Sequence, residues 1–381
     1  MRIVVAPDSW KASLDAPAVV EATRRGILNA YPDWVVDGVA MADGGEGTAE
    51  VVARARGGTW WTVPTEDAYG RPVTAPLLAL DDGTVVVEVA AGPGFVPPAR
   101  RPRPGWEATS RGLGRMIRAA VDRGARRVVV TLGGTGFSDG GMGLLEALGA
   151  RWETDVPPAT TSLGATGAVR LPSLPVPVEC WCDVDSPLTG PTGAIFRFGP
   201  QKGLPDERLA EWDAAMAEWG RRLGEACGRD VAAVPGAGAA GGAGAALLAL
   251  GATIRAGGDA VADIVGLDAR MAAADVVITG EGAVDAQSAG GKVVGTVARR
   301  GSRLGKPVVA LAGTVGPGAD ALYPQGLKAI YPALPGPMTL DEAVAGAARL
   351  IEQASAHLAR WLAWAAGAVT TPDGGTERYG G

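Results

Sequence analysis

Histidine and cysteine are scarce in this chain of 381 residues, and their scarcity argues against several kinds of site. The one histidine, His357, lies in an expected helix near the C-terminus, so neither a histidine metal cluster nor a Ser–His–Asp triad is expected. The three cysteines include no C-x-x-C pair, which is typical of a protein of the reducing cytoplasm. Two of them, Cys180 and Cys182, are interpreted as packing residues on one face of a strand.

Positive charge is not in excess, and no long apolar segment stands out. The 35 basic and 41 acidic residues give a net charge of −6, which is not the pattern of a protein that binds nucleic acid or an anionic membrane. The first eleven residues do not form a secretory signal. The longest uncharged stretch, residues 231–254, consists mostly of Gly and Ala and is interpreted as a loop followed by a buried helix. We therefore expect neither a nucleic-acid nor a membrane partner.

Alternating strand and helix patterns at both ends of the chain predict a parallel sheet. Residues 3–6 and 35–41 are expected strands on either side of a helix at residues 14–30. Near the C-terminus, residues 276–279 and 308–311 have the pattern of buried strands. This order of elements predicts a Rossmann-like α/β domain, which a single long helix near the C-terminus completes.

The middle of the chain has a different pattern. Three expected strands, residues 60–63, 73–80 and 84–89, follow one another at short intervals, and short turns imply antiparallel pairing. We therefore predict an α/β fold with two α/β domains. Residues 1–59 and 262–381 form the Rossmann-like parallel-sheet domain, and residues 60–261 form a mixed-sheet domain inserted into it.

Lysine is the rare cation of this sequence. Only five of the 35 basic residues are lysines, and Lys11, Lys202 and Lys292 lie in loop-like segments rich in Gly, Ser, Asp or Gln. A compact ammonium beside exposed backbone N–H groups suits a phosphate, whereas Lys306 and Lys328 precede expected strands and are interpreted as surface residues. Chance explains any one lysine in a loop, but three in such settings favour a phosphate-binding role.

Glycine is abundant, with 58 residues, and four glycine-rich segments are candidate ligand loops. Those at residues 133–141 and 279–288 follow convincing strands, and the one at residues 42–48 follows a reasonable one, as expected for a site at the carboxyl ends of strands. The fourth, residues 236–242, matches the dinucleotide pattern G-x-G-x-x-G, although a poor strand precedes it. One such loop indicates a tight turn, whereas several together predict a site for a polyanion.

Carboxylates lie beside these loops. Asp43, Asp139 and Asp285 are candidate Mg²⁺ ligands, with a helix N-cap as the alternative for Asp43 and Asp139. Asp183 and Asp185 end an expected strand, and alternation along it would place both side chains on one face. That pair indicates either a cation site or a solvated strand end.

Taken in order along the chain, these motifs resemble the bacterial glycerate kinase family, of the type that makes 2-phosphoglycerate. The resemblance implies two α/β domains with the active site in the cleft between them, MgATP as phosphoryl donor, D-glycerate as acceptor, and a role in glyoxylate, glycerate or sugar-acid catabolism; a homodimer is left open. The chain departs from the family pattern at Phe137, Ser138 and Ala283, where the family usually has Arg at the last position. The motifs that carry the resemblance are residues 6–14, 42–48, 133–141, 183–188, 198–203, 236–242 and 279–292.

With that chemistry, positioning and charge neutralisation matter more than covalent catalysis. Asp8 or Asp185 would accept the proton of the substrate hydroxyl, and Lys11 would contact the phosphates. Alternatives are a kinase for another small hydroxy acid, a nucleotide-dependent oxidoreductase and a non-catalytic ligand-binding relative. The candidate nucleotide-binding residues are Gly133, Gly134, Ser138, Lys202, Gly280, Glu281, Gly282 and Lys292, and the candidate metal ligands are Asp43, Asp139 and Asp285.

Overall fold

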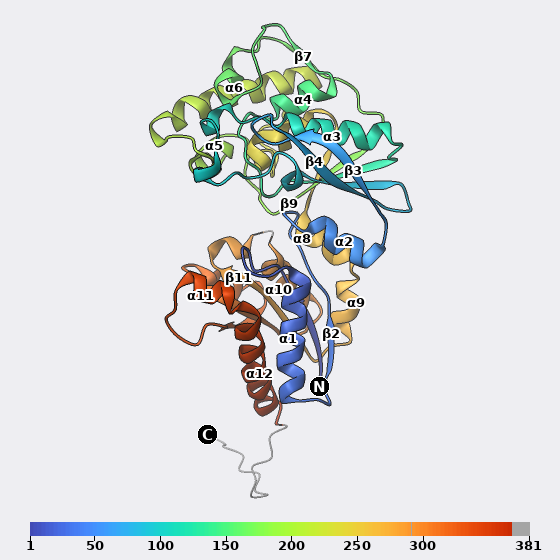
Figure 1. Cartoon of the computed structure of the whole chain (residues 1–381), viewed down its shortest axis with the longest axis vertical. Helices are drawn as coiled ribbons and strands as arrows, with labels where there is room; N and C mark the ends of the chain where they lie inside the picture. The colour runs from blue at the N-terminus through green and yellow to red at the C-terminus, as the bar shows by residue number, and fades with distance from the viewer. Residues whose placement is uncertain (291, 368–381) are drawn as a thin grey trace, which may run out of the picture. The chain divides into compact units, whose positions relative to one another are not determined.

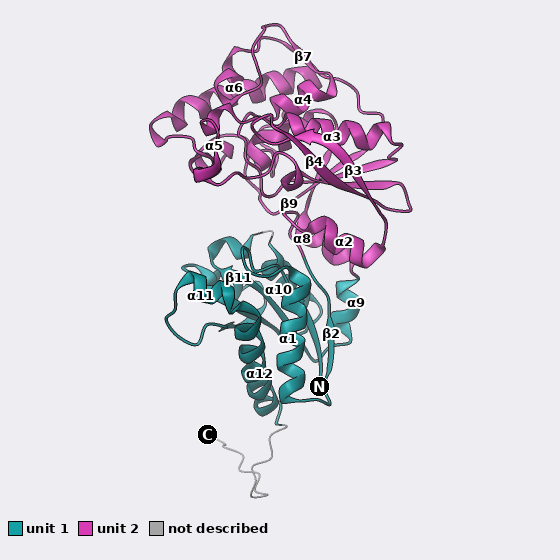
Figure 2. Cartoon of the chain, viewed as in Figure 1, with its two compact units in different colours: residues 1–41, 266–381 teal, residues 42–265 magenta. Residues whose placement is uncertain are grey.

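The structure, a computed structural model, describes residues 1–290 and 292–367. The chain divides into two compact units, which we call unit 1 (residues 1–41 and 266–381) and unit 2 (residues 42–265) (Figure 2). The first junction lies earlier than the expected residue 59. The reason is that helix α2 (Thr48–Arg56) packs on strands β4 (Pro72–Ala79) and β5 (Thr84–Glu88) and therefore belongs with them in unit 2.

Unit 1 is built on a parallel sheet of five strands in the order β13-β12-β11-β1-β2 (Figure 1). Every neighbouring pair in this sheet runs parallel, which confirms the predicted Rossmann-like sheet. From β1 the chain proceeds to β2 on one side, whereas β11, β12 and β13 extend to the other, so the order reverses between β1 and β11. The strands are β1 (Arg2–Pro7), β2 (Val35–Gly38), β11 (Val276–Val284), β12 (Val308–Val315) and β13 (Leu327–Pro332).

Helices cover both faces of this sheet because successive strand residues point to opposite sides. Val309 shares a buried core with α1 and α12, whereas Val308 lies against Gly301 of α10. The expected long C-terminal helix is two helices that meet at Gly346, and the tail beyond residue 367 lies outside the described residues. The helices of unit 1 are α1 (Ala16–Ala30), α9 (Leu267–Ala272), α10 (Val293–Arg303), α11 (Leu340–Ala345) and α12 (Ala347–Ala365).

Unit 2 contains a mixed sheet of six strands in the order β10-β9-β6-β5-β4-β3. The hairpin partners β3, β4 and β5 are antiparallel, as the short turns predicted, and β5, β6, β9 and β10 are parallel. A small second sheet pairs β7 with β8. The remaining strands are β3 (Thr59–Glu66), β6 (Arg127–Thr131), β7 (Arg151–Trp152), β8 (Val169–Arg170), β9 (Val178–Cys182) and β10 (Thr253–Ala256).

Helix α6 packs on α5, α7 and the short helix η4 (Thr160–Ala165) with the apolar stripe that its sequence predicts. Its side chains Trp212, Met216, Trp219 and Leu223 are buried, and the Trp219 indole donates a hydrogen bond to the Gly140 carbonyl at 2.8 Å. The core of unit 2 is thereby tied directly to a glycine-rich loop. The helices are α3 (Arg111–Asp122), α4 (Met142–Leu148), α5 (Ala194–Phe198), α6 (Leu209–Cys227), α7 (Ala243–Ala249) and α8 (Gly257–Ile264).

The long uncharged stretch and the cysteines behave as expected. Helix α7 follows the glycine-rich turn, and each of its residues is buried. Cys180 and Cys182 are buried on β9, and His357 is exposed on α12. Across residues 1–290 and 292–367, none of the helices has both the length and the apolar character that crossing a bilayer demands.

The close packing of α1 on α12 depends on Gly26. A Cβ atom there would lie 2.1 Å from the Glu352 carbonyl oxygen and 2.8 Å from the Ser355 Cβ. Alanine gains up to about 1 kcal/mol of helix propensity over glycine, but overpacking against a fixed backbone costs about 1–3 kcal/mol. We expect Gly26→Ala to lower the free energy of unfolding in urea.

The matched control is Gly336→Ala, because a Cβ there meets no atom within 4 Å. That variant should stay within about 0.5 kcal/mol of the parent protein. Stabilisation by Gly26→Ala would show that the two helices can separate at little cost.

Candidate functional site

In unit 1, two carboxylates lie where the strand order reverses, the position at which open α/β sheets bind ligands. Pro7 of β1 is paired with Gly280 of β11, so the next residues, Asp8 and Glu281, lie at the same level. The Asp8 amide donates to the Gly280 carbonyl at 2.8 Å, which fixes this register. Asp8 is 7% exposed and Glu281 is 8% exposed. The fold thus brings two acidic residues to the same level of the central strands, Asp8 just after β1 and Glu281 within β11.

An ammonium group accompanies them. Lys292 is the residue that precedes α10, and its Nζ lies 3.6 Å from Glu281 Oε2. A partly buried carboxylate and ammonium at this distance reduce the cost of removing each from water. Unit 1 therefore holds three predicted site residues near one another. Strand register places Asp8 beside Glu281, and an ion pair joins Glu281 to Lys292.

The predicted glycine loop after β11 is corrected by the structure. Gly280 and Glu281 are paired with Leu311 and Ala312 of β12, and the strand continues to Val284. The backbone of Gly280, Glu281 and Gly282 therefore belongs to the sheet rather than to a loop that cradles phosphate. Glycine is required at position 280 because a Cβ there would lie 2.1 Å from the Leu311 carbonyl oxygen.

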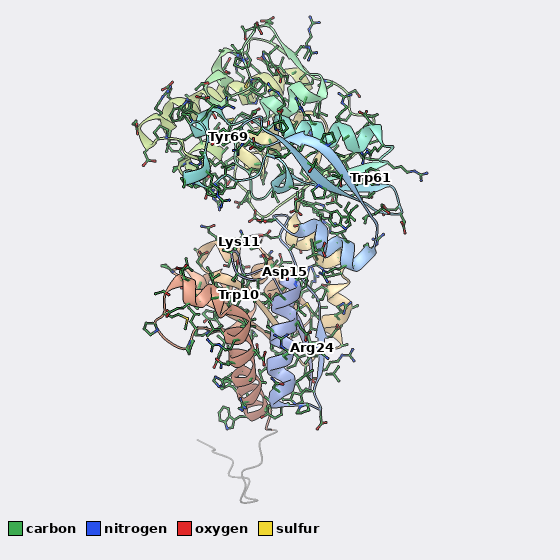
Figure 3. All side chains as sticks on the ribbon, viewed as in Figure 1. Trp10, Lys11, Asp15, Arg24, Trp61 and Tyr69 are labelled. Atoms are coloured by element: carbon green, nitrogen blue, oxygen red, sulfur yellow. The ribbon has the colours of Figure 1, made fainter. Side chains whose placement is uncertain are left out.

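Lys11 lies in the tight turn that follows β1, and its side chain is exposed (Figure 3). The turn is closed by the amides of Ser13 and Leu14, which donate to the Trp10 carbonyl at 2.9 and 3.0 Å. A Cβ on Gly282 would lie 3.7 Å from the Lys11 amide nitrogen, so this turn borders the end of β11. The turn brings the backbone of Lys11 to the edge of the sheet where Asp8 and Glu281 lie.

Asp285 has a structural role in the described residues. Its Oδ1 accepts a hydrogen bond from the Gln287 amide at 2.8 Å, and its own amide donates to the Ser288 hydroxyl at 3.0 Å. These bonds form a capping box at the short helix η8 (Ala286–Ala289). Asp285 therefore serves as a turn cap through one carboxylate oxygen, and its role as a magnesium ligand stays a prediction.

In unit 2, the loop that contains Asp43 packs on the loop that begins at Gly133. The Gly133 amide donates to the Gly44 carbonyl at 3.1 Å, and a Cβ on Gly133 would lie 2.5 Å from the Gly45 Cα. The Gly133 amide is thus occupied by protein, so nucleotide binding by Gly133, which stays a prediction, would not use this amide, and Gly134 adopts a φ of 74°. Asp43 is 7% exposed, and its Oδ1 accepts from the Gly45 amide at 3.0 Å.

Sequence analysis missed Glu88, at the carboxyl end of β5. Its two carboxylate oxygens accept hydrogen bonds from the amides of Gly47 and Ala49, at 2.9 and 3.0 Å, where α2 begins. Burial raises the pKa of Glu88, and these amides oppose the rise. The sequence patterns did not indicate Glu88 because it appears in them as the last residue of a strand. An acidic residue at the end of a buried strand is nevertheless a signal of a candidate site residue.

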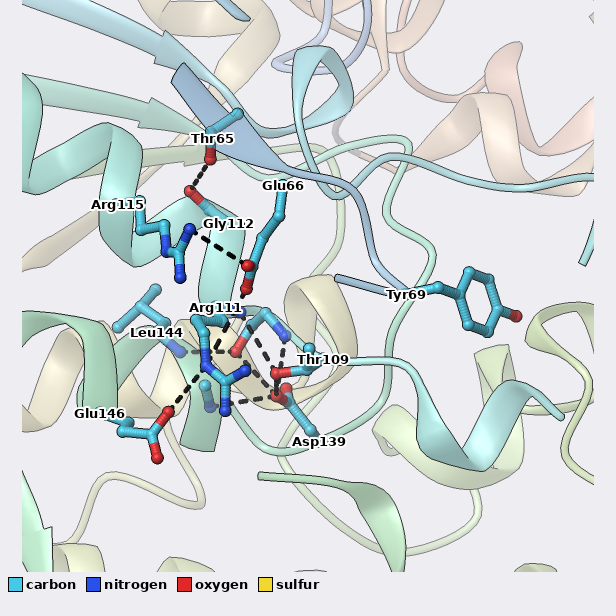
Figure 4. A network of polar contacts seen from close by, with 12 residues as sticks. Thr65, Glu66, Tyr69, Thr109, Arg111, Gly112, Arg115, Asp139, Leu144 and Glu146 are labelled. Atoms are coloured by element: carbon cyan, nitrogen blue, oxygen red, sulfur yellow. Dashed lines mark hydrogen bonds and ion pairs between the residues drawn. The ribbon is translucent and has the colours of Figure 1, made fainter. Parts of the chain in front are cut away.

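Asp139 is fully buried, and the protein itself occupies both of its carboxylate oxygens (Figure 4). Oδ1 accepts from the Gly141 amide at 3.1 Å. Oδ2 accepts from Thr109 Oγ1 at 3.1 Å, from the Gly143 amide at 3.1 Å, and from the amide and hydroxyl of Ser110 at 2.8 and 2.9 Å. Mg²⁺ keeps several of its waters in protein sites. The predicted role of Asp139 as a magnesium ligand does not fit this dry, saturated carboxylate.

Lys202 is 4% exposed, and its ammonium donates to Thr135 Oγ1 at 2.9 Å and to the Phe137 carbonyl at 2.8 Å. Burial lowers the pKa of Lys202 to about 7, and the charge of Asp139 opposes that shift. Ser138, the next residue of the same loop, has 0% exposure, and its hydroxyl finds no partner within the described part of the chain. This placement contradicts a direct phosphate contact by Ser138.

Asp185 is not paired with Asp183 in the way that strand alternation predicts, because β9 already ends at Cys182. The Asp185 side chain is 90% exposed and lies 3.5 Å from the Arg197 guanidinium, which also donates to Ser186 Oγ at 2.9 Å. Asp185 is thus a solvated residue beyond the strand end.

The dinucleotide pattern is also explained. The segment directly before Gly236 is not a strand, and a Cβ on Gly241 would lie 2.2 Å from the Phe137 carbonyl oxygen. Gly241 therefore allows close packing against the loop of residues 133–141. Among residues 1–290 and 292–367, no group of three or more His, Cys, Asp or Glu side chains is placed to hold a metal by itself.

Comparison with known proteins shows to which family the chain belongs. The model of the glycerate kinase family matches residues 3–363. The chain belongs to the glycerate kinase family. A protein of Escherichia coli called glycerate 2-kinase is 37% identical over 379 residues, which cover 95% of this chain and 98% of that protein.

Two further relatives support the assignment. A protein of Bacillus subtilis called glycerate kinase is 35% identical over 371 residues, which cover 94% of this chain and 97% of that protein. A crystal structure assigned to glycerate kinase 2 from Salmonella typhimurium LT2 has a TM-score of 0.79 and 35% identity, with 97% of this chain and 100% of that chain covered. Membership of a kinase family implies a small-molecule substrate and ATP as phosphate donor, and glycerate kinases are phosphotransferases with an alcohol acceptor.

Glu88 gives a stability test for the loop that holds Asp43. Folding raises its pKa above the usual value of about 4.3. Between the unfolded and folded pKa values the native state binds more protons, so the free energy of unfolding falls as the pH rises through that window. Glutamine does not titrate, so the free energy of unfolding of Glu88→Gln should fall less than that of the parent protein as the pH rises. Urea unfolding measured between roughly pH 4 and 8 tests this.

Glu50→Gln is the matched control, because Glu50 is exposed on the same helix and pairs with Arg54 at 3.1 Å. Its stability should follow the pH dependence of the parent protein. Parallel curves for Glu88→Gln and the parent would contradict the raised pKa.

Proposed function

We propose that the chain transfers the γ-phosphoryl group of MgATP to D-glycerate and forms 2-phosphoglycerate. The observation that carries this proposal is the match to the glycerate kinase family over residues 3–363. The 2-position is supported by the Escherichia coli relative, whose name specifies a glycerate 2-kinase. A role in glyoxylate, glycerate or sugar-acid catabolism, a cytoplasmic location and a homodimer are predictions that accompany it.

The side chains of unit 1 suit the charge problem of phosphoryl transfer. The reacting phosphates carry several negative charges, and catalysis consists largely of holding and neutralising them. Lys292 already lies beside Glu281, at 3.6 Å, and exposed Lys11 borders the same sheet end. We assign both ammonium groups to phosphate oxygens. Because each ammonium is a compact point charge, it can follow the phosphate as charge moves during transfer.

Asp8 is the proposed acceptor of the substrate hydroxyl proton. It lies at the end of β1, its side chain is only 7% exposed, and its Oδ1 accepts from the Ser9 amide at 2.6 Å. A carboxylate is the realistic base because the one histidine is remote in sequence, on α12. Asp185 is less suited to the role because it is solvated.

Asp43 is a predicted metal ligand that fits magnesium. Its Oδ1 accepts one hydrogen bond, and within the described residues its Oδ2 accepts none, so a hard carboxylate oxygen is available for Mg²⁺. When bound, Mg²⁺ would neutralise charge on the phosphates. Glu88 supports Asp43 indirectly, because it holds the amides at the other end of the same loop.

The proposed activity is tested by ³¹P NMR of a reaction that contains the protein, MgATP and D-glycerate. We expect ADP and a new phosphomonoester signal at the position of 2-phosphoglycerate, with standards of both isomers and a reaction without acceptor as controls. A panel of other small hydroxy acids tests the alternative that Phe137 and Ala283 suggest, since Ala283 leaves the family's usual arginine absent. ATP binding without turnover on any acceptor would overturn the proposal.

Lys11 and Lys292 give the matching kinetic test. Replacing either with alanine removes one charge contact to the transition state, so kcat/KM for glycerate should fall roughly a hundredfold. Lys328→Ala is the control, because Lys328 is exposed on β13, and it should leave the rate unchanged. Parent-like kinetics in Lys11→Ala or Lys292→Ala would remove that lysine from the mechanism.

A further inference from the structure

Lys202 is an unusual lysine because its charged end is inside the protein. Its ammonium has three N–H groups, and within the described residues two are used, by Thr135 Oγ1 at 2.9 Å and by the Phe137 carbonyl at 2.8 Å. The ammonium also lies 5.7 Å from the centre of the Phe137 ring, whose face favours a cation. One N–H remains for another acceptor. The loop of residues 133–141 therefore determines where this charge is held.

Asp139 fixes the same loop through the hydrogen bonds of its carboxylate. The carboxylate accepts hydrogen bonds from the amides of Gly141 and Gly143 at the start of α4. It also accepts hydrogen bonds from the amide and the hydroxyl of Ser110 at the start of α3. Ser110 Oγ in turn accepts from the Leu144 amide at 2.8 Å. Figure 4 shows the carboxylate at the centre of this network. Since Phe137 is two residues before Asp139, anchoring the carboxylate also anchors the carbonyl that holds Lys202.

We propose that Asp139 is a positioning residue for Lys202: it fixes the loop whose Thr135 hydroxyl and Phe137 carbonyl hold the ammonium, so that the ammonium is in place to meet an anionic substrate. The catalytic part of this inference rests on the proposed function, because the anion would be the phosphate or carboxylate of the reactants. The structural part stands on unit 2 alone, in which all the residues named above lie.

The charged groups on the segments around Lys202 identify Asp139 as its compensating charge. The short helix η5 (Pro200–Lys202) contacts α5, which carries Arg197, and Arg101 donates to the Gln201 carbonyl at 2.5 Å. Both arginines are cations, and they cannot stabilise a second positive charge. Burial lowers the pKa of Lys202 to about 7, and the charge of Asp139 opposes this. Burial also raises the pKa of Asp139, and the hydrogen bonds from Ser110, Gly143 and Gly141 oppose that rise by favouring the charged carboxylate. Loss of the carboxylate should therefore lower the pKa of Lys202 further.

The test is NMR of the protein labelled with ¹³C at lysine Cε, in which five lysines give a simple spectrum. The Lys202 signal is assigned by its absence in Lys202→Met and is followed through a pH titration. We expect Asp139→Asn to lower the pKa of Lys202 by about one unit, the effect of removing one opposite charge. A fall from about 7 to about 6 reduces the charged fraction at pH 7 roughly fivefold, and kcat should fall by the same factor, with its alkaline limb shifted to lower pH.

Glu146→Gln is the matched control. Glu146 is a carboxylate of the same network that pairs with Arg111 at 2.7 Å, and within the described residues its side chain accepts no hydrogen bond from the loop of residues 133–141. This variant should leave the Lys202 titration and the pH profile unchanged. An equal shift in both variants, or none in Asp139→Asn, would overturn the proposal.

Ser110→Ala keeps the test decisive if Asp139→Asn does not fold. It retains the carboxylate but removes the hydroxyl donor at 2.9 Å, so the carboxyl becomes easier to protonate and compensates Lys202 less. We expect a smaller fall of the Lys202 pKa in the same direction, and an unchanged titration in this folded variant would overturn the inference. Because the titration needs no turnover, it can succeed or fail independently of glycerate phosphorylation.

Discussion

A carboxylate removed from water must be given donors by the protein, and this requirement shapes the glycine-rich edge of unit 2. Transfer of an isolated charge into the interior costs several kcal/mol. Asp139 offsets that cost with five hydrogen bonds from four residues. Some of its donors are the first amides of α3 and α4, which helices leave without partners. One side chain thus satisfies two helix starts and fixes the loop between β6 and α4.

The same physical solution recurs at two other acidic residues. Glu88 accepts hydrogen bonds from two amides where α2 begins, and Asp285 caps the short helix η8. Acidic residues beside glycine-rich turns therefore divide into two kinds in this protein. Glu88 and Asp139 use both carboxylate oxygens to hold backbone amides, whereas within the described residues Asp43 and Asp285 each use only one. Distinguishing these kinds requires the positions of the amides, which spacing along the chain does not supply.

Unit 1 shows how topology gathers charge. The strand order reverses between β1 and β11, so the chain leaves the ends of these neighbouring strands in different directions. Open α/β sheets bind ligands at such a reversal, and strand register places Asp8 and Glu281 at the same level there. Lys292 joins them because α10 begins there. The arrangement follows from connectivity, and it would place any residues at these positions together.

Local sequence determined the features of this protein that depend on patterns within a single segment. The five-strand parallel sheet, the antiparallel hairpins and the buried stripe of α6 follow from strand and helix periodicity, and the order of motifs along the chain predicted the family. Tertiary structure alone decided which polar groups are already paired. Gly280 became part of a strand because β12 lies beside it, Ser138 was buried beneath its loop, and Asp139 met donors from a helix about thirty residues away in sequence. Hydrogen bonds between distant segments depend on where the chain folds back, and no pattern within a single segment encodes that.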